Sequence, residues 1–517
     1  MSTFDYLSET SIYEMLEKSV QEYPNRIAVI DGSIQCTYTQ LKTWVDTFAS
    51  HLVQKGFQKG DRVGLMLPNG IHYVISYYAT QRLGGTVVQV NPLYQTSELQ
   101  YIIDDSTPKW FICQEHQSEK LDKITNTNNM SVIFTKDKNG VDQILLTEQI
   151  KELPPLQIIA KEDVAVLQYT GGTTGKSKGA MLTHFNVLCN IHQTGAIYAP
   201  VIKKGEERLL GIAPLTHAMA MTNMNYALVC IAATYIILEK FNTKALLELI
   251  KEYRPTFFVG APTMYIALLN HPDLEQYDLS CFKLLLAGSA PLPVEVIKQL
   301  EEKTGAIIFE GYGLSEVTTS ATRTPLNGKR KIGSVGMPLP ETEAKIVDLE
   351  TGLKEMPNGE EGELIVKGPQ IMKGYWNKPL ETAETIRDGW LYTGDIAIRD
   401  EDGYYFIVGR KKDMVIAGGL NIYPAEVEDV LYQHSDIAET CVFGVPDAYL
   451  GEKLLAVVVL KEGSTLTEDE LLSWCEERMA RYKVPRGIEF RDEIPKTFVG
   501  KVLRRKLVEE FANKQNA

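Results

Sequence analysis

Strand-like and helix-like segments alternate along the first part of the chain, and this alternation restricts the fold more than any other feature of the sequence. We expect strands at 27–30, 62–66, 86–90 and 110–113 and helices at 12–22, 41–53 and 71–82. Repeated strand–helix units form largely parallel sheets that are covered by helices. The predicted fold class is therefore α/β. Later segments at 425–480 mix two helices with two strands, which predicts a smaller α+β domain at the C-terminal end.

A loop rich in glycine, threonine and lysine follows the apolar run 164–170, and it reads TGGTTGKSKG from Thr170 to Gly179. Glycines allow backbone angles at which several N–H groups point toward one centre. The hydroxyl groups and the two lysines, Lys176 and Lys178, add donors and positive charge. A flexible surface loop would need none of these features. We therefore predict that this loop binds a polyphosphate.

The loop is not the P-loop of NTPases. The pattern G-x-x-x-x-G-K-[ST] needs a glycine at position 170, where this chain has Thr170. A P-loop also continues directly into a helix, whereas here Thr183 is expected to cap a helix that begins near His184. The sequence thus predicts a phosphate loop of another design.

Three predicted strands end near Thr170, Gly288 and Glu310. In open α/β sheets, ligands bind beyond the carboxyl ends of the strands, so these three ends are expected to surround one site. Tyr312 can lie against a purine, and Glu316 is an oxygen ligand that suits Mg²⁺. A glutamate alone would only indicate a solvated helix start, but the other two strand ends favour a functional role.

Composition and charge restrict the class of protein. The chain has 517 residues and a net charge of −14, which disfavours nucleic acid as a partner. Its seven cysteines are scattered without a C-x-x-C pattern, as in reduced cytosolic proteins. The first residues do not resemble a signal peptide, and the longest apolar run, 228–238, is shorter than the roughly 20 residues of a membrane span. We expect a cytoplasmic protein without a transmembrane segment; peripheral membrane contact and a homodimer stay open.

The loop from Tyr169 to His184 closely resembles the signature loop of the adenylate-forming superfamily, which includes acyl-CoA synthetases, peptide-synthetase adenylation domains and beetle luciferases. Gly171 and Ser177 replace the usual serine and proline, and some fatty acyl-CoA synthetases share the glycine. The resemblance covers nearly the whole chain, with further motifs at 307–316, 388–419 and 495–504.

This resemblance implies a set of ATP- and AMP-binding residues, which are Thr170, Gly171, Gly172, Thr173, Thr174, Gly175, Lys178, Gly288, Ser289, Ala290, Glu310, Gly311, Tyr312, Gly313, Ser315, Asp395 and Arg410. Asp395 and Arg410 would contact the ribose. Thr173 and Glu316 would position Mg²⁺. Lys501 would bridge the substrate carboxylate and the α-phosphate, offsetting negative charge as the pentavalent centre forms.

The resemblance also implies a domain organisation. Residues 1–409 would form the adenylation domain, with βα-built sheets and a small β unit. A hinge at 410–413, centred on Lys412, would connect it to a mobile α+β domain at 414–517. Rotation about this hinge would withdraw Lys501 and bring Gly418 and Gly419 over the pantetheine of CoA. Arg504 and Arg505 are expected only to face water.

The acid-binding part of the site is implied by the segment that ends at His217, which family members place beside the acyl group. Met219, Met221, Met224 and Gly260 are candidates for the acyl pocket, because methionine is flexible and polarisable. Core packing explains the three methionines equally well. Peptide-synthetase domains usually have a Phe-Asp pair in this segment, and its absence disfavours an amino-acid substrate.

The resemblance therefore implies an acid–thiol ligase that uses Mg²⁺, ATP and CoA. A fatty acid would first form acyl-AMP with release of pyrophosphate, and the CoA thiol would then give acyl-CoA and AMP. An apolar, methionine-lined pocket without a charged anchor suits long or medium acyl chains. The alternatives are a ligase for an aryl acid such as a cinnamate or benzoate, a luciferase-like oxygenase, and a non-catalytic acyl-nucleotide sensor.

Overall fold

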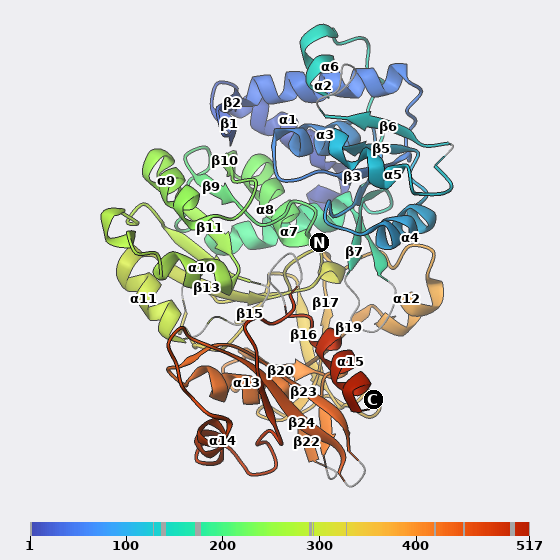
Figure 1. Ribbon diagram of the computed structural model, residues 1–517. Coiled ribbons are helices and arrows are strands. Elements are labelled where there is room, and N and C mark those ends of the chain that lie inside the picture. The colour runs from blue at the N-terminus through green and yellow to red at the C-terminus, as the bar shows by residue number, and fades with distance from the viewer. Residues whose placement is uncertain are drawn as a thin grey trace. The chain divides into compact units, whose positions relative to one another are not determined.

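The chain forms two compact units in the computed structural model, which describes residues 3–127, 129–135, 141–170, 177–288, 292, 294–326, 328–417, 420–447, 450–496 and 502–515. The N-terminal unit comprises Met1–Glu343 and Lys367–Leu391. The C-terminal unit comprises Ala344–Val366 and Tyr392–Ala517. Each unit has its own apolar core. The strands of the four sheets are labelled in Figure 1 where there is room.

The larger sheet of the N-terminal unit has nine strands in the order β15-β14-β13-β12-β11-β9-β10-β1-β2. Their bounds are β1 (Ile27–Asp31), β2 (Ile34–Thr37), β9 (Arg208–Gly211), β10 (Thr234–Ile237), β11 (Phe257–Gly260), β12 (Leu284–Ala287), β13 (Ile307–Tyr312), β14 (Thr322–Arg323) and β15 (Met337–Pro338). The strands from β1 to β13 along this order are parallel, while β2, β14 and β15 pair antiparallel at the two edges. The parallel centre confirms the α/β prediction.

The second sheet of this unit has six strands in the order β6-β5-β3-β4-β7-β8. They are β3 (Arg62–Met66), β4 (Thr86–Gln89), β5 (Trp110–Cys113), β6 (Ser131–Phe134), β7 (Val164–Thr170) and β8 (Lys178–Thr183). Only β8 runs antiparallel to its neighbour, so that β7 and β8 form the two sides of the predicted phosphate loop.

Helices connect and cover these strands. They are α1 (Ile12–Glu22), α2 (Tyr38–Gln54), α3 (Ile71–Arg82), α4 (Thr96–Ser106), α5 (Ser118–Leu121), α6 (Val141–Thr147), α7 (His184–Tyr198), α8 (Ala218–Asn225), α9 (Thr243–Tyr253), α10 (Pro262–Leu269), α11 (Val294–Thr304) and α12 (Pro379–Thr385), with short turns η1 (Asp5–Glu9), η2 (Glu115–Gln117), η3 (Tyr226–Cys230), η4 (Leu274–Gln276) and η5 (Ser315–Val317). Thr183 caps α7 as predicted, and Ser11 caps α1, each within a capping box. Apolar residues of α9, α10 and α11 pack with those of β9 to β13 into one buried core.

The C-terminal unit has two smaller sheets. In the first, β17 (Glu361–Lys367) lies between β16 (Glu343–Val347) and β19 (Trp390–Arg399), and β20 (Tyr405–Arg410) pairs with β19. The two-residue strand β18 (Ile386–Arg387) belongs to the N-terminal unit and pairs with Trp390 and Leu391 at the start of β19. The second has the order β22-β21-β24-β23, with bounds β21 (Val415–Ala417), β22 (Leu420–Ile422), β23 (Ile437–Asp447) and β24 (Gly451–Leu460), and β25 (Ile488–Phe490) lies beside β24. Three helices, α13 (Pro424–Tyr432), α14 (Glu468–Glu476) and α15 (Arg504–Gln515), complete the predicted α+β part.

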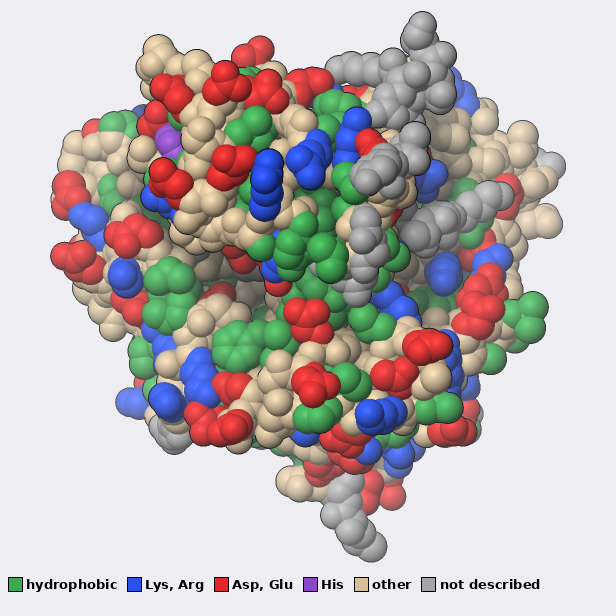
Figure 2. Space-filling model, turned by 90° about the horizontal axis from the view of Figure 1, so that it is seen from below, with side chains coloured by type: hydrophobic (Ala, Val, Ile, Leu, Met, Phe, Trp, Pro, Cys, Tyr) green, Lys and Arg blue, Asp and Glu red, His purple; other side chains and the backbone are tan. Residues whose placement is uncertain are grey.

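Acidic and basic side chains are interspersed with apolar ones on the face drawn in Figure 2. Among the helices that the structure describes, none is both long enough and apolar enough to cross a bilayer.

Candidate functional site

A single tyrosine, Tyr375, contacts both the lysine at the end of the phosphate loop and the predicted metal ligand. Its hydroxyl donates a 2.7 Å hydrogen bond to Oε1 of Glu316, which lies in η5 just beyond β13. The Nζ atom of Lys178, the first residue of β8, lies 4.6 Å from the centre of the Tyr375 ring. Through Tyr375, the positive charge of Lys178 in the six-stranded sheet lies close to the Glu316 carboxylate, which follows β13 of the nine-stranded sheet.

The backbone around Tyr375 fixes this arrangement. Met372 N donates to Glu316 O at 2.8 Å, and Trp376 N donates to Gly179 O at 2.8 Å. Met181 N in turn donates to Gly374 O at 2.8 Å. The segment 372–376 is therefore hydrogen-bonded to β8 on one side and to the Glu316 turn on the other. The ends of β7 and β13 therefore lie near one another, while a common ligand site at the three strand ends stays a prediction.

The two ends of the phosphate loop are held together. Thr170 and Lys178 are cross-strand partners, and the Ser177 hydroxyl donates to the Thr170 carbonyl. Tyr101 of α4 donates to Ser177 O at 2.8 Å. The loop residues Gly171, Gly172, Thr173, Thr174, Gly175 and Lys176 lie outside the described residues, so their contacts with phosphate remain predictions.

The predicted adenine-binding segment follows two adjacent parallel strands. Ala287 of β12 pairs with Glu310 of β13, which places Gly288 beside Gly311 at the carboxyl ends of the two strands. Burial raises the pKa of the Glu310 carboxyl group. Gly313 has no room for a side chain, because a Cβ atom there would lie 1.6 Å from the Thr319 carbonyl oxygen. Tyr312, which ends β13, and Ser315, which begins η5, also belong to this segment, and Ser289 and Ala290 lie outside the described residues.

The candidate acyl residues do not all have the same surroundings. His217 caps α8, with its Nδ1 atom accepting from Met219 N at 3.4 Å. Met219 approaches Gly288 so closely that a Cβ atom on the glycine would lie 2.9 Å from its sulfur. Met221 and Met224 are fully buried, and Met221 accepts from the Tyr77 hydroxyl. The structure thus brings His217 and Met219 beside the predicted nucleotide segment. Gly260, at the end of β11, packs against the Tyr265 ring.

The predicted ribose contacts lie together in the C-terminal unit. Asp395 of β19 and Arg410 of β20 are cross-strand partners, and Arg410 Nε is 3.0 Å from Asp395 Oδ1. Arg410 remains partly exposed, while the carboxylate of Asp395 is nearly buried. A carboxylate held by a guanidinium in this way is fixed in orientation and can accept from a diol.

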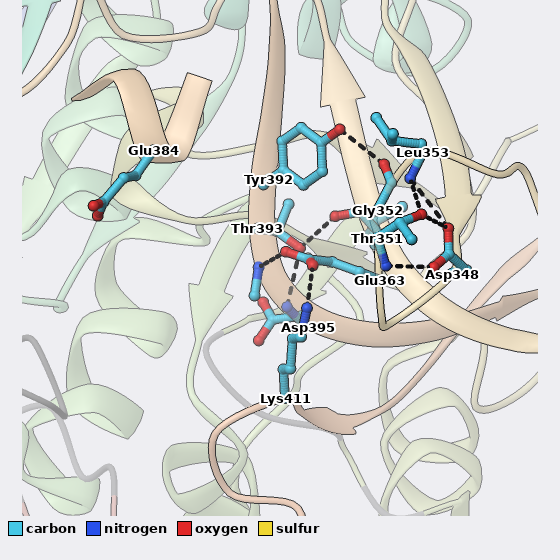
Figure 3. A network of polar contacts seen from close by, with 12 residues as sticks. Asp348, Thr351, Gly352, Leu353, Glu363, Glu384, Tyr392, Thr393, Asp395 and Lys411 are labelled. Atoms are coloured by element: carbon cyan, nitrogen blue, oxygen red, sulfur yellow. Dashed lines mark hydrogen bonds and ion pairs between the residues drawn. The ribbon is translucent and has the colours of Figure 1, made fainter. Parts of the chain in front are cut away.

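The neighbours of Asp395 were not foreseen from the sequence. Figure 3 shows Glu363 of β17 beside Lys411 and Asp395. Glu363 accepts from Gly394 N at 3.1 Å and pairs with Lys411 Nζ at 3.1 Å. Thr393 donates to Leu364 O and accepts from Asp395 N. The buried Glu363 therefore fixes both the strand that holds Asp395 and the residue that precedes the predicted hinge residue, Lys412.

The expectation that Arg504 only faces water is wrong. Its Nη1 atom lies 2.9 Å from Asp413, its Nη2 atom lies 2.6 Å from Glu428, and Nε donates to Val442 O at 2.8 Å. Burial raises the pKa of Glu428, and the Arg504 guanidinium opposes that shift. The first helical residue of α15 is thereby tied to the residue after Lys412. Arg505 is exposed and pairs with Glu509, as expected for a solvent-facing charge. Gly418, Gly419 and Lys501 lie outside the described residues.

Glu316 suits a metal ion that takes its remaining ligands from a bound polyphosphate. Within the described residues, no three His, Cys, Asp or Glu side chains gather into a metal site. Mg²⁺ is commonly bound by one or two carboxylates together with substrate phosphates. Glu316, close to the lysine that ends the phosphate loop, fits that mode of binding.

Comparisons with known proteins agree with this geometry. The family model described as AMP-binding enzyme matches residues 16–376, and the model described as AMP-binding enzyme C-terminal domain matches residues 426–501. A long-chain-fatty-acid–CoA ligase of Bacillus subtilis is 44% identical over 535 residues, covering 98% of this chain and 95% of the relative. One from Escherichia coli is 38% identical over 538 residues, with the same coverage. The crystal structure of ATP-bound MatB from Rhodopseudomonas palustris is 31% identical, with a TM-score of 0.90 and coverage of 98% of this chain and 99% of that chain.

Proposed function

Because this chain belongs to the AMP-binding enzyme family, we propose that it is an ATP-dependent fatty acid–CoA ligase. A carboxylate oxygen of the acid attacks the α-phosphorus of ATP, and the bond to the β-phosphate breaks, giving acyl-AMP and pyrophosphate. The CoA thiol then attacks the acyl carbon and AMP leaves. The names of the relatives from B. subtilis and E. coli support a fatty acid as the substrate.

The observation that carries this proposal is the placement of Lys178 and Glu316 on either side of Tyr375. A polyphosphate needs positive charge and a metal ligand within the length of one triphosphate, and these two residues supply both. Lys178 and the loop from Thr170 to Gly175 bind the β- and γ-phosphates. Glu316 and the Thr173 hydroxyl would hold Mg²⁺, which would supply charge neutralisation of these phosphates.

The C-terminal unit supplies the other nucleotide contacts in this proposal. Asp395 accepts from the ribose hydroxyls, and Arg410 holds this carboxylate in place. Lys501 bridges the acid and the α-phosphate during adenylation. Residues 414–517 then rotate about Lys412, within the hinge 410–413 that follows the adenylation domain 1–409. Gly418 and Gly419 approach the pantetheine of CoA after this rotation.

The acid binds on the side of the nucleotide segment that His217 and Met219 approach. Met221 and Met224 are buried behind them and adapt the pocket to an alkyl chain. We also propose a cytoplasmic location, which the cysteines support: among the seven, five are buried, and all seven are free thiols.

Acid-dependent exchange of labelled pyrophosphate into ATP tests the first step. We expect exchange with fatty acids, followed by acyl-CoA and AMP as products when CoA is added, identified by mass spectrometry. Exchange only with aryl acids such as cinnamate or benzoate would favour the aryl-acid alternative. Oxygen uptake or light with a luciferin would indicate an oxygenase. Nucleotide binding without exchange for any acid would leave a non-catalytic sensor.

A further inference from the structure

Arg323 is a buried cation without an anionic partner. It lies in the two-residue strand β14, between β13 and β15, and is only 6% exposed. Its Nη2 atom donates to the Ser320 hydroxyl at 2.7 Å, and its Nε atom has no hydrogen-bond partner. Within the described part of the chain, no carboxylate lies within ion-pair distance of this guanidinium. A buried charge in these surroundings is unfavourable unless a ligand completes its hydrogen bonds.

The space occupied by Arg323 depends on a glycine. Gly311 of β13 is its cross-strand partner, and a Cβ atom on Gly311 would lie 2.8 Å from both Cδ and Nη1 of Arg323. Any side chain at position 311 would therefore displace the guanidinium. Gly311, a glycine of the predicted nucleotide segment, thus leaves room for the Arg323 guanidinium beside it.

A second unsatisfied polar group lies on the same face of β13. Phe309 and Gly311 are two residues apart and so face the same side of the strand, where Phe309 packs on Tyr198 with ring centres 5.9 Å apart. The Tyr198 hydroxyl is buried without a hydrogen-bond partner. Burial raises the pKa of Tyr198, and the Arg323 guanidinium opposes that shift, so the two groups are close enough to interact. A guanidinium and a phenol are together well suited to a carboxylate.

This polar pair is close to the candidate acyl helix. Thr222 of α8 and Thr319 share a hydrogen bond of 2.7 Å between their hydroxyls. The residue after Thr319 is Ser320, which holds the Arg323 guanidinium. Arg323 therefore binds the neighbour of a residue that contacts α8, the helix that carries Met219 and Met221.

We propose that Arg323, assisted by Tyr198, binds a second carboxylate at the far end of the acid, so that the enzyme takes α,ω-dicarboxylic acids as substrates. This inference rests on the proposed ligase activity and specifies its substrate class. It replaces the expectation of an acyl pocket without a charged anchor. A site built to bind a polar group discriminates strongly against an analogue that lacks it, because its own buried groups are then left unpaired.

The test compares saturated monocarboxylic and α,ω-dicarboxylic acids of equal length, from six to sixteen carbons, in acid-dependent pyrophosphate exchange. At the matching length, we expect kcat/KM for the diacid to exceed that of the monoacid by at least about tenfold. Arg323→Met should remove this preference and leave exchange with the monoacid equal or faster. Arg323→Lys, which keeps the charge, should retain part of the preference. Arg254→Met, at an exposed arginine paired with Asp278, serves as the control.

Binding measured without turnover separates this inference from the ligase proposal. Titration calorimetry of the matching diacid should show binding to the wild type and at least about tenfold weaker binding to Arg323→Met. The inference would be overturned if the wild type preferred no diacid at any length, or if Arg323→Met lowered exchange with both acids equally, as a purely structural arginine would. Exchange with neither acid, together with Arg323-dependent binding of the diacid, would contradict the ligase proposal alone.

Discussion

The Tyr375 hydroxyl donates a 2.7 Å hydrogen bond to Glu316, although 59 positions separate the two residues in the chain. Burial, and then the nearby Glu316 charge, raise the pKa of Tyr375. The phenol therefore stays protonated and remains a donor across the physiological pH range. This bond fixes the carboxylate next to the cation of Lys178, before any ligand binds.

Tyr375→Phe removes this bond and should raise KM for Mg·ATP. A hydrogen bond to a charged group contributes about 1.5–3 kcal/mol, so we expect KM to rise about tenfold or more in pyrophosphate exchange. Tyr277→Phe is the matched control, because its hydroxyl also donates to a glutamate, Glu248, far along the chain and at the surface. The same KM in wild type and Tyr375→Phe would show that the bond does not order the site.

Glu316→Gln keeps the size of the side chain and removes its charge. The variant should need a higher Mg²⁺ concentration for half-maximal exchange, because a neutral amide is a weaker ligand for a hard divalent cation. Titration of Mg²⁺ at constant ATP measures this shift. If the Mg²⁺ dependence is unchanged, Glu316 does not belong to the metal site.

Lys501→Ala should separate the two half-reactions. We expect formation of acyl-AMP to be lost, because the charge that offsets the pentavalent centre is gone. Thioester formation from supplied acyl-AMP and CoA should remain near the wild-type rate. Equal loss of both activities would contradict rotation of the C-terminal domain between the two steps.

Arg504→Met should destabilise the C-terminal unit, since it leaves Asp413 and Glu428 without their shared cation. Removing one partner of a well-buried pair costs about 3–5 kcal/mol, and the partial exposure of Arg504 reduces our expectation to about 2 kcal/mol. Thermal unfolding of the full chain followed by circular dichroism measures the change. Arg505→Met, at an exposed pair with Glu509, should change stability by about 0.5 kcal/mol or less. Similar effects of both substitutions would contradict a stabilising role for the buried cluster.

His184 should make the N-terminal unit sensitive to acid. Burial lowers the pKa of this imidazole to about 4, from an ordinary value near 6.5. Below the ordinary value the unfolded chain gains a proton that the folded chain does not bind, so stability falls as pH falls. Between about pH 7 and about pH 5 we expect a loss of about 2 kcal/mol from this residue.

His184→Asn tests that expectation, because an amide can still accept from Ile12 N, as His184 Nδ1 does at 3.3 Å. Urea unfolding of the N-terminal unit at both pH values should show a smaller acid loss in the variant. Identical slopes in wild type and His184→Asn would show that His184 does not cause the acid sensitivity.

Much of the fold of the N-terminal unit could be predicted because its strands and helices have strong local signals. The bounds of β3, α3, β5 and β7 agree residue for residue with the prediction, since apolar runs or helical periodicity end there at clear breaks. The polar stretch 114–162 has no such signals, because it is rich in residues typical of loops. It contains β6 and α6, whose short apolar segments become regular only by pairing with β5 and packing on α2.

The candidate site was predictable where a motif specifies a residue type and not where function depends on long-range contacts. Glu316 and Asp395 lie in recognisable motifs. Tyr375 and Glu363 do not, and only their contacts with Glu316 and with Gly394 show what they do. Arg323 was missed for a similar reason: a lone arginine in a two-residue strand gives no local sign that its guanidinium is buried without an anionic partner.

Gly313 has a genetic consequence. The turn between β13 and η5 brings the Thr319 carbonyl to the place where a side chain at position 313 would begin. Every missense change in this codon would add a Cβ atom that clashes with the Thr319 carbonyl oxygen. Inherited variation at codon 313 is thus expected to be synonymous, and a deep mutational scan should find no tolerated substitution there.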